Sequence, residues 1–261
     1  MGKFTGKKAL VTASSSGIGK AIANVLAEEG ATVHIFSRNA ERVKKAADQI
    51  IKETGSTVTY SAGDMSNISD IKRIIEEVRL GIGVPDFLVL NYGDPKIAEF
   101  LDLSEEDWSK AINMILMSSV LFVKAFIPQM TGRGGRLVFV TSLTTKQPME
   151  HFALSASLRS AVVSLSKVIS LEYSGKGITS NCISQGYIQT PRLEAIAIRN
   201  STQQGTTIEE AYRQIRESIP QKRIGDPKEV GKLVSFLCSD DASYINGTNI
   251  QIDGGIIRFP F

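Results

Sequence analysis

The sequence predicts an α/β protein, a doubly wound parallel sheet of about seven strands with helices on both faces. Short runs of β-branched and other apolar residues alternate with segments of helical periodicity along the whole chain. Several of the runs are continuously apolar, as expected of strands that are buried on both faces. No linker or internal repeat interrupts the pattern, so residues 1–261 are expected to form one domain. The expected strands are residues 9–11, 33–36, 58–60, 87–90, 137–140, 179–183 and 249–252.

The segments between these strands repeat apolar residues every three or four positions, which predicts amphipathic helices. In the first of them Ile18, Ile22 and Leu26 share one face, and Gly30 is suited to end the helix. A longer polar segment at about 191–222 departs from this rhythm. Because it follows a strand of the predicted sheet, we expect it to form a lid over a binding site.

The composition restricts the classes of function. Hydrophobic residues make up 42% of the chain and charged residues 22%, which is typical of a globular protein. The formal charge is +3, but Lys and Arg are scattered, so nucleic acid is not an expected partner. Cys182 and Cys238 lie in apolar surroundings and are expected to be buried thiols, and no Cys/His cluster has the spacing of a metal site. The most apolar stretch, 112–127, holds several polar residues, and the N-terminus lacks a signal-peptide core. We therefore expect a soluble cytoplasmic protein that does not span a membrane.

A glycine-containing loop at residues 12–19 joins the first expected strand to the first helix. Glycines allow the backbone to approach a pyrophosphate, and the start of a helix offers free N–H groups and the positive end of its dipole. A loop in this context predicts a Rossmann-like dinucleotide site, in which serine hydroxyls add further donors. The expected phosphate-binding residues are Ser14, Ser16, Gly17, Ile18 and Gly19.

The residues at the end of the second strand favour one form of the cofactor. An NAD site of this kind places a carboxylate here to bind the ribose hydroxyls, whereas an arginine can pair with the 2′-phosphate of NADP. The chain has Ser37 and Arg38 at this point, and no acid. We expect both residues to contribute to cofactor binding, with NADP(H) favoured over NAD(H).

Several stretches together resemble the short-chain dehydrogenase/reductase family. Residues 12–19 resemble its Thr-Gly-x-x-x-Gly-x-Gly loop, with Ala13 in place of the first glycine. Residues 181–190 resemble its Asn-x-x-x-Pro-Gly-x-Ile-x-Thr stretch, and 223–230 and 252–255 carry further matches. The resemblance implies an oxidoreductase with a nicotinamide cofactor. It also implies contacts to the adenine from Asp64 and Met65, to the cofactor from Asn91 and Gly93, and to the nicotinamide carboxamide from Ile188 and Thr190.

The same resemblance implies a catalytic serine, tyrosine, lysine and asparagine. Ser142 occupies the serine position. The tyrosine, expected to within one position, falls on Leu154, and the lysine four residues later falls on Leu158. The asparagine falls on Ile115, and no tyrosine lies between residues 137 and 172. A phenol with a pKa of ~10 needs the neighbouring lysine to act near neutral pH, and leucine can neither donate a proton nor carry a charge. Standard carbonyl reduction is therefore expected to be lost, and cofactor binding without the lysine to be weak.

Two interpretations of such a chain remain open. In the first, it is a cofactor-binding relative that acts as a non-catalytic binding or regulatory partner. In the second, it is an active NAD(P)H-dependent oxidoreductase with a substitute proton donor, or with a substrate such as an activated alkene that needs no proton from tyrosine. The candidate donors are Tyr92, Lys146, His151 and Tyr187, and Tyr92 also places a large side chain beside the expected cofactor.

Self-association is expected from the resemblance, because the family pairs its fourth and fifth helices across a dimer interface. Apolar residues within 114–121 and 162–165, and the apolar chain end at 256–261, suit contacts with neighbouring subunits. We expect a homotetramer, or at least a dimer, that binds a small-molecule ligand.

Overall fold

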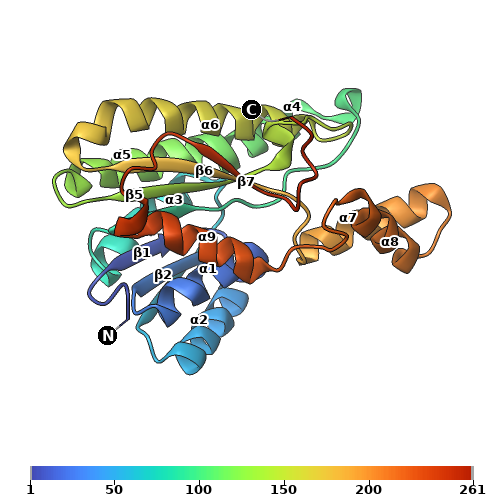
Figure 1. Ribbon diagram of the computed structural model, residues 1–261. Coiled ribbons are helices and arrows are strands. Elements are labelled where there is room, and N and C mark those ends of the chain that lie inside the picture. Colours follow the sequence, from blue (N-terminus) through green and yellow to red (C-terminus); the bar gives the residue numbers. More distant parts are fainter. Residues whose placement is uncertain (1, 260–261) are drawn as a thin grey trace.

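A seven-stranded parallel sheet forms the centre of the protein, in agreement with the fold class predicted from the sequence (Figure 1). The computed structural model describes residues 2–259, so Met1 and the last two residues of the apolar chain end, 260–261, lie outside the described part. The order across the sheet is β3-β2-β1-β4-β5-β6-β7. The strands are β1 (Lys8–Val11), β2 (Thr32–Ser37), β3 (Val58–Ala62), β4 (Phe87–Leu90), β5 (Arg136–Ser142), β6 (Thr179–Gln185) and β7 (Asn249–Ile252).

The strand order reverses beside β1. From β1 the chain winds outward through β2 to β3, and then crosses back to β4 on the other side of β1. Val11 pairs with Ile35 of β2 and with Val89 of β4, so these strands end at the same edge. The crevice outside the carboxyl ends of the strands, at such a reversal, is where α/β sheets bind ligands.

Helices cover both faces of the sheet (Figure 1). They are α1 (Gly17–Glu28), α2 (Ala40–Thr54), α3 (Ile68–Gly81), α4 (Glu105–Ala111), α5 (Ser118–Met130), α6 (Ala153–Tyr173), α7 (Pro191–Gln204), α8 (Ile208–Ser218) and α9 (Pro227–Cys238). One core cluster joins α1, α2 and α9 to one face, with Ile22, Val43 and Val234 among its buried residues. A second joins α3, α5 and α6 to the opposite face, with Phe122 and Leu154 among its members.

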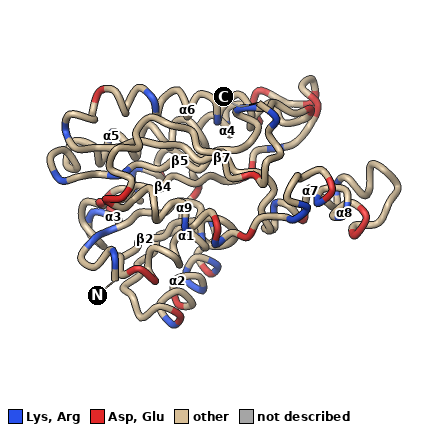
Figure 2. Tube along the Cα trace, viewed as in Figure 1, with Lys and Arg blue, Asp and Glu red and all other residues tan. Residues whose placement is uncertain are grey.

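Charged residues lie mainly on the helices and loops around the sheet, with both signs interspersed (Figure 2). A polar group inside the sheet is His34 on β2, which is 2% exposed. Its two ring nitrogens lie 2.8 Å from the Thr59 hydroxyl and 2.9 Å from the Ser61 hydroxyl on β3. Burial lowers the pKa of His34 to about 4, so the ring is neutral in the fold at neutral pH. Cys182 and Cys238 are buried free thiols, as expected.

A π-helical turn, η2 (Ile112–Met117), joins α4 to α5. Turns of this kind widen a helix locally and recur at functional sites. The hydroxyl of Ser118 donates to the carbonyl of Met114 at 2.7 Å, and that of Ser119 donates to the carbonyl of Ile115 at 2.6 Å. Two buried serines therefore bind carbonyl groups of the turn.

Two helical segments, 105–130 and 153–176, are long and apolar enough to cross a membrane by length and composition alone. Their most apolar windows are 50% and 44% buried within the protein. Both segments contribute side chains to the core cluster on one face of the sheet. Their apolar character therefore has a structural role in this fold.

The segment expected to form a lid folds as a helical hairpin, α7 and α8, which extends beyond the carboxyl edge of the sheet (Figure 1). Both halves of this polar segment are helical, residues 191–204 and 208–218. Thr190 caps α7 by accepting a hydrogen bond from the Leu193 N–H, and Pro191 suits the first turn. The two helices pack on each other through Leu193, Ala197, Ala211, Ile215 and Ile219.

Candidate active site

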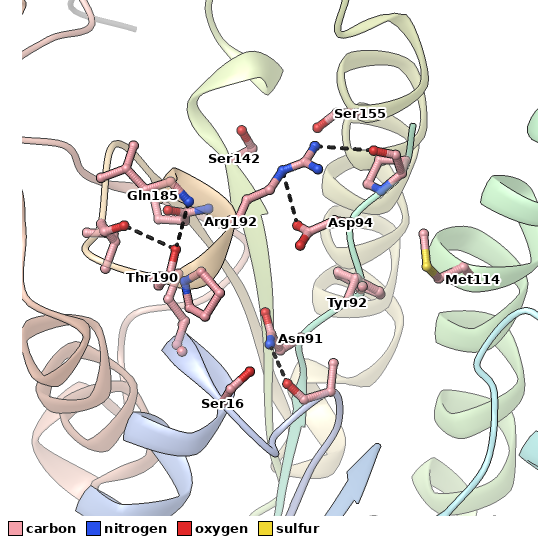
Figure 3. Close-up of a pocket in the computed structure, with 18 of the residues that line it drawn as sticks. Ser16, Asn91, Tyr92, Asp94, Met114, Ser142, Ser155, Gln185, Thr190 and Arg192 are labelled. Carbon is pink, nitrogen blue, oxygen red and sulfur yellow. Dashed lines mark hydrogen bonds and ion pairs between the residues drawn. The ribbon is translucent and has the colours of Figure 1, made fainter. Parts of the chain in front are cut away.

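A cavity of about 400 Å³ lies where the strand order reverses, at the carboxyl edge of the sheet (Figure 3). Its walls come from the β1–α1 loop, the ends of β2 and β3, the loop after β4, the first turns of α6 and the lid helix α7. Twelve of the expected site residues line it: Ser16, Gly17, Ile18, Ser37, Arg38, Asp64, Met65, Asn91, Gly93, Ser142, Ile188 and Thr190.

The β1–α1 loop presents the start of α1 to the cavity. Ser15, Ser16, Gly17 and Ile18 all line it. Ser16 is the N-cap of α1, yet its side chain makes no capping hydrogen bond, so the first N–H groups of the helix have no side-chain acceptor. Gly17 has a φ of +55°, a left-handed conformation that glycine adopts without strain. This helix start is suited to bind an anion.

Two residues expected to bind phosphate do not line the cavity and have a structural role instead. Ser14 is fully buried, and its hydroxyl donates to the Val11 carbonyl at 2.7 Å and accepts from the Phe36 N–H at 3.0 Å. The expectation of a Ser14 hydroxyl donor was therefore wrong, because both neighbouring strands already use that hydroxyl. Gly19 is also away from the cavity: a Cβ there would lie 2.3 Å from the Ala13 carbonyl oxygen, so only glycine allows this approach of helix and loop.

The far end of the cavity collects groups from β2, β3 and α2. Ser37 has a buried hydroxyl with no hydrogen-bond partner within the described residues. Arg38 and Arg42 both line this end, together with Asp64. Arg42, in the first turn of α2, was not predicted from the sequence as a site residue. Two guanidinium groups here favour an anionic group of the ligand.

The loop after β4 is tied to the β1–α1 loop. The Asn91 side-chain amide donates to the Ala13 carbonyl at 3.1 Å, and the Asn91 N–H donates to the Thr12 hydroxyl at 3.0 Å. At Gly93 a Cβ would lie 2.8 Å from the sulfur of Met114, so a larger residue would displace that side chain. Asn91 and Gly93 therefore fix the cavity wall between the two loops.

The cavity face of α6 differs from the expectation by one residue. Ser155 and Arg159 line the cavity, whereas Leu154 and Leu158 are 1% and 7% exposed and belong to the core cluster. The expected positions were wrong because a slip of one residue turns a side chain by about 100° around a helix. Ser142 at the end of β5 also lines the cavity, and its hydroxyl accepts from the Thr144 N–H at 3.2 Å. Figure 3 shows Ser142 and Ser155 on the same side of the cavity.

Arg159 is a buried cation in the cavity wall. Its side chain donates to the Val140 carbonyl at 2.9 Å, while its Nε has no hydrogen-bond partner among the described residues. The guanidinium carbon lies 5.4 Å from the centre of the Tyr92 ring. Burial lowers the pKa of Arg159, and the charge of Asp94 opposes this shift. Because Nε is buried, only terminal N–H groups of the guanidinium that do not bind the Val140 carbonyl can reach a ligand.

Tyr92 does not direct its hydroxyl toward a ligand. The hydroxyl lies 2.7 Å from the Ser119 hydroxyl, which in turn donates to the Ile115 carbonyl. Burial raises the pKa of Tyr92 far above its usual value. Tyr92 is thus a poor candidate for the substitute proton donor, and its ring packs against Arg159. Ile115, the expected asparagine position, is fully buried, and Met114 lines the cavity instead.

The remaining candidate donors are separated by the fold. Tyr187 lines the cavity, and burial raises its pKa. Lys146 is not part of the cavity lining. His151 lies in a separate shallow groove beside Phe100 and Pro148. Tyr187 is therefore the one member of the expected set whose position allows a role as donor.

An ion pair connects the lid to the cavity wall. Arg192 on α7 lies with its Nε 3.4 Å from an Asp94 carboxylate oxygen, and it also donates to the Pro95 carbonyl at 3.2 Å. All three residues line the cavity. No sequence pattern predicted this contact, because the partners lie far apart in the chain.

Comparisons with known proteins agree with this geometry. A family model described as Enoyl-(Acyl carrier protein) reductase matches residues 12–257. Oxidoreductase UcpA from Salmonella typhimurium is 36% identical over 260 residues, which cover 98% of this chain and 96% of that protein. The chain belongs to the short-chain dehydrogenase/reductase family. The expected family is thus confirmed.

Two solved structures of this oxidoreductase family share the fold over nearly the whole chain. L-Sorbose reductase from Gluconobacter frateurii, complexed with NADPH and L-sorbose, is 29% identical with a TM-score of 0.93, covering 99% of this chain and 100% of that one. An NADPH-bound short chain oxidoreductase from Pseudomonas aeruginosa PAO1, described as containing an atypical catalytic center, is 27% identical with a TM-score of 0.87, again covering 99% and 100%. These neighbours support a nicotinamide cofactor.

Proposed function

We propose that this protein binds NADP(H) in the cavity and does not carry out the tyrosine–lysine carbonyl reduction of its family. The observation that carries the proposal is the face of α6 toward the cavity. It presents Ser155 and Arg159, four residues apart, and we assign these to the positions of the family's tyrosine and lysine. The structural neighbour with an atypical catalytic center also binds NADPH, which supports cofactor binding by such a relative.

The cavity has the groups that NADP(H) needs. The uncapped start of α1 can bind the pyrophosphate through backbone N–H groups. The unpartnered Ser37 hydroxyl, with Arg38 and Arg42, suits the 2′-phosphate. Asp64 and Met65 are assigned to the adenine, and Asn91, Gly93, Ile188 and Thr190 to the nicotinamide end.

Weak binding was expected because the cation beside the nicotinamide ribose was thought to be missing. Arg159 removes that reason, because its guanidinium lines the cavity and carries a positive charge. We therefore infer that Arg159 contributes to cofactor binding in place of the family's lysine.

The proton step is where the cavity departs from its family. A bound NADP(H) would supply a hydride for reduction or accept one for oxidation, so a group of the protein would have to donate or accept the matching proton. Neither a serine hydroxyl nor an arginine exchanges a proton readily near neutral pH. The hydroxyls of Ser142 and Ser155 can still bind a substrate oxygen and orient it. The cavity can thus orient a substrate oxygen but has no matched acid to protonate it. This supports the loss of ordinary carbonyl reduction.

A second candidate function is an active oxidoreductase with Tyr187 as substitute donor. The favouring observation is that Tyr187 lines the cavity, unlike Lys146 and His151. Burial raises the pKa of Tyr187, so its hydroxyl would be a weak acid. We therefore rank this candidate second.

Cofactor binding is tested by calorimetric titration with NADPH and NADH. We expect NADPH to bind more tightly, and Arg38→Ala or Arg42→Ala to weaken NADPH binding by roughly 10- to 100-fold with little effect on NADH. Arg213→Ala, on the exposed surface of α8, is the matched control and should change neither. Tighter NADH binding, or binding of neither nucleotide, would overturn the proposal.

Loss of the family reaction is tested by NADPH oxidation over a broad panel of ketones, aldehydes and sugars. We expect rates near background. Turnover that disappears in Tyr187→Phe would establish the second candidate. Turnover that persists in Tyr187→Phe would mean that another group donates the proton, and the proposed loss of reduction would be wrong.

A further inference from the structure

We infer that the substrate end of the cavity takes a ligand with one carboxylate and an apolar body, and that Arg192 of the lid binds that carboxylate. This inference rests on the proposed function, because it assigns the remaining space beside the cofactor. It concerns the residues around Ser142, Ser155 and Arg192, which Figure 3 shows together above Tyr92.

The charges at this end of the cavity are unbalanced. Arg159 and Arg192 line it, and Asp94 is the only carboxylate among the described residues that line this end. Arg159 is 7% exposed, and its Nε lacks a partner within residues 2–259. Two guanidinium groups and one carboxylate leave one positive charge uncompensated, so an anionic group of a ligand would be favourable here. One negative charge restores the balance.

The contact between Arg192 and Asp94 is weak enough for a ligand carboxylate to replace Asp94. The separation of 3.4 Å is longer than the 2.7–2.9 Å typical of a charge-assisted hydrogen bond. The Asp94 side chain is 52% exposed and that of Arg192 is 28% exposed, so water screens the pair. Figure 3 shows the Arg192 side chain reaching toward Asp94 between Ser142 and Ser155. A ligand carboxylate at this place could replace Asp94 as the partner of the guanidinium.

Apolar side chains also line this end of the cavity, beside the hydroxyls of Ser142 and Ser155. Its walls carry side chains that can bury a hydrocarbon or an aromatic ring but cannot pair with a second charge. These side chains are Met114, Leu143, Met149, Phe152, Leu193 and Ile196. The single uncompensated charge and these apolar side chains favour a monocarboxylate over a dicarboxylate.

The alternative is that Arg192 and Asp94 only hold the lid in place. The two explanations predict opposite effects of Asp94→Asn. If Asp94 competes with the ligand for Arg192, the substitution frees the guanidinium and tightens carboxylate binding. If the pair holds the lid, the substitution loosens the hairpin and weakens binding of every ligand.

The test is calorimetric titration of the NADP⁺-saturated protein, and of the free protein, with octanoate, 3-phenylpropionate and the amide of each. We expect at least one carboxylate to bind roughly 10-fold or more tightly than its amide, from the energy of a charge-assisted hydrogen bond. Arg192→Met should remove this preference, and Asp94→Asn should increase it. Arg199→Met, on the same helix but outside the cavity lining, is the matched control and should leave it unchanged.

Three outcomes would overturn the inference: equal binding of carboxylates and amides, no binding of either carboxylate, or an unchanged preference in Arg192→Met. Weaker carboxylate binding in Asp94→Asn would also overturn it, by assigning the pair to holding the lid. Failure of NADP⁺ to bind, with the carboxylate preference still present in the free protein, would instead contradict the proposed function alone.

Discussion

The register of α6 can be tested by placing a tyrosine and a lysine on either of its two faces. In one variant, Ser155→Tyr is combined with Arg159→Lys. In the matched variant, Leu154→Tyr is combined with Leu158→Lys. Both introduce the same two side chains four residues apart on one helix. Only the first pair faces the cavity.

The two variants should differ greatly in stability. Leu154 is 1% exposed and Leu158 is 7% exposed, so the second variant forces a larger ring and an ammonium group into the core cluster. Overpacking costs about 1–3 kcal/mol, and an unpaired buried charge several more. A loss of at least about 4 kcal/mol is a large part of a stability of about 5–15 kcal/mol, and should lower Tm by about 10 °C or more. The cavity-facing variant should remain within about 2 kcal/mol of the parent.

Activity gives the second measurement. A positioned general acid is worth ~10²–10⁴ in rate, so the Ser155→Tyr, Arg159→Lys variant should show NADPH oxidation above the parent with at least one carbonyl compound. The two substitutions should act jointly, because tyrosine alone would keep its high pKa. Circular dichroism melting and the loss of NADPH absorbance are the two assays. If the Leu154→Tyr, Leu158→Lys variant is the stable and active one, the assignment of Ser155 and Arg159 is wrong.

Four further outcomes are expected. Tyr92→Leu should weaken NADPH binding by roughly 3- to 10-fold, because the ring under Arg159 is lost, whereas Tyr92→Phe keeps the ring and should match the parent by calorimetry. His34 has a folded pKa of about 4, below its ordinary 6.5, so the unfolded chain binds the proton first as the pH falls. Stability should therefore drop by up to about 3 kcal/mol between pH 6.5 and 4, and less so in His34→Gln, by urea unfolding. Ala13 has a φ of +48°, so Ala13→Gly should be tolerated within about 1 kcal/mol while Ala13→Val costs about 1–3 kcal/mol by the same unfolding measurement. Light scattering at micromolar concentration should give a tetramer or a dimer, and a monodisperse monomer would contradict that expectation.

The sequence was informative where the physical signal is periodic or local. Short runs rich in β-branched and apolar residues located all seven strands, and the loop that holds Ser16 and Gly17 was recognisable from its place between a strand and a helix. The sequence did not show which residues of α6 face the cavity. Counting from Ser142 leaves an uncertainty of one residue, and one residue decides whether a side chain faces the core or the cavity. The direction of the Ser14 hydroxyl was equally hidden, because a loop serine can turn toward either the ligand or the backbone. Contacts between segments far apart in the chain, such as Arg192 with Asp94, cannot be predicted from the pattern of a single sequence.

The lid hairpin carries its own small apolar cluster, separate from the two clusters that hold the sheet. Because α7 and α8 pack on each other, replacing this hairpin with another sequence need not disturb the sheet and the helices that position the cofactor loop. Its inner side supplies Arg192, Leu193 and Ile196 to the cavity. Ligand preference in this fold can therefore diverge within a segment of about thirty residues, while the nucleotide-binding scaffold stays the same. A chimaera that transplants residues 191–222 would transfer the part of that preference that Arg192, Leu193 and Ile196 supply.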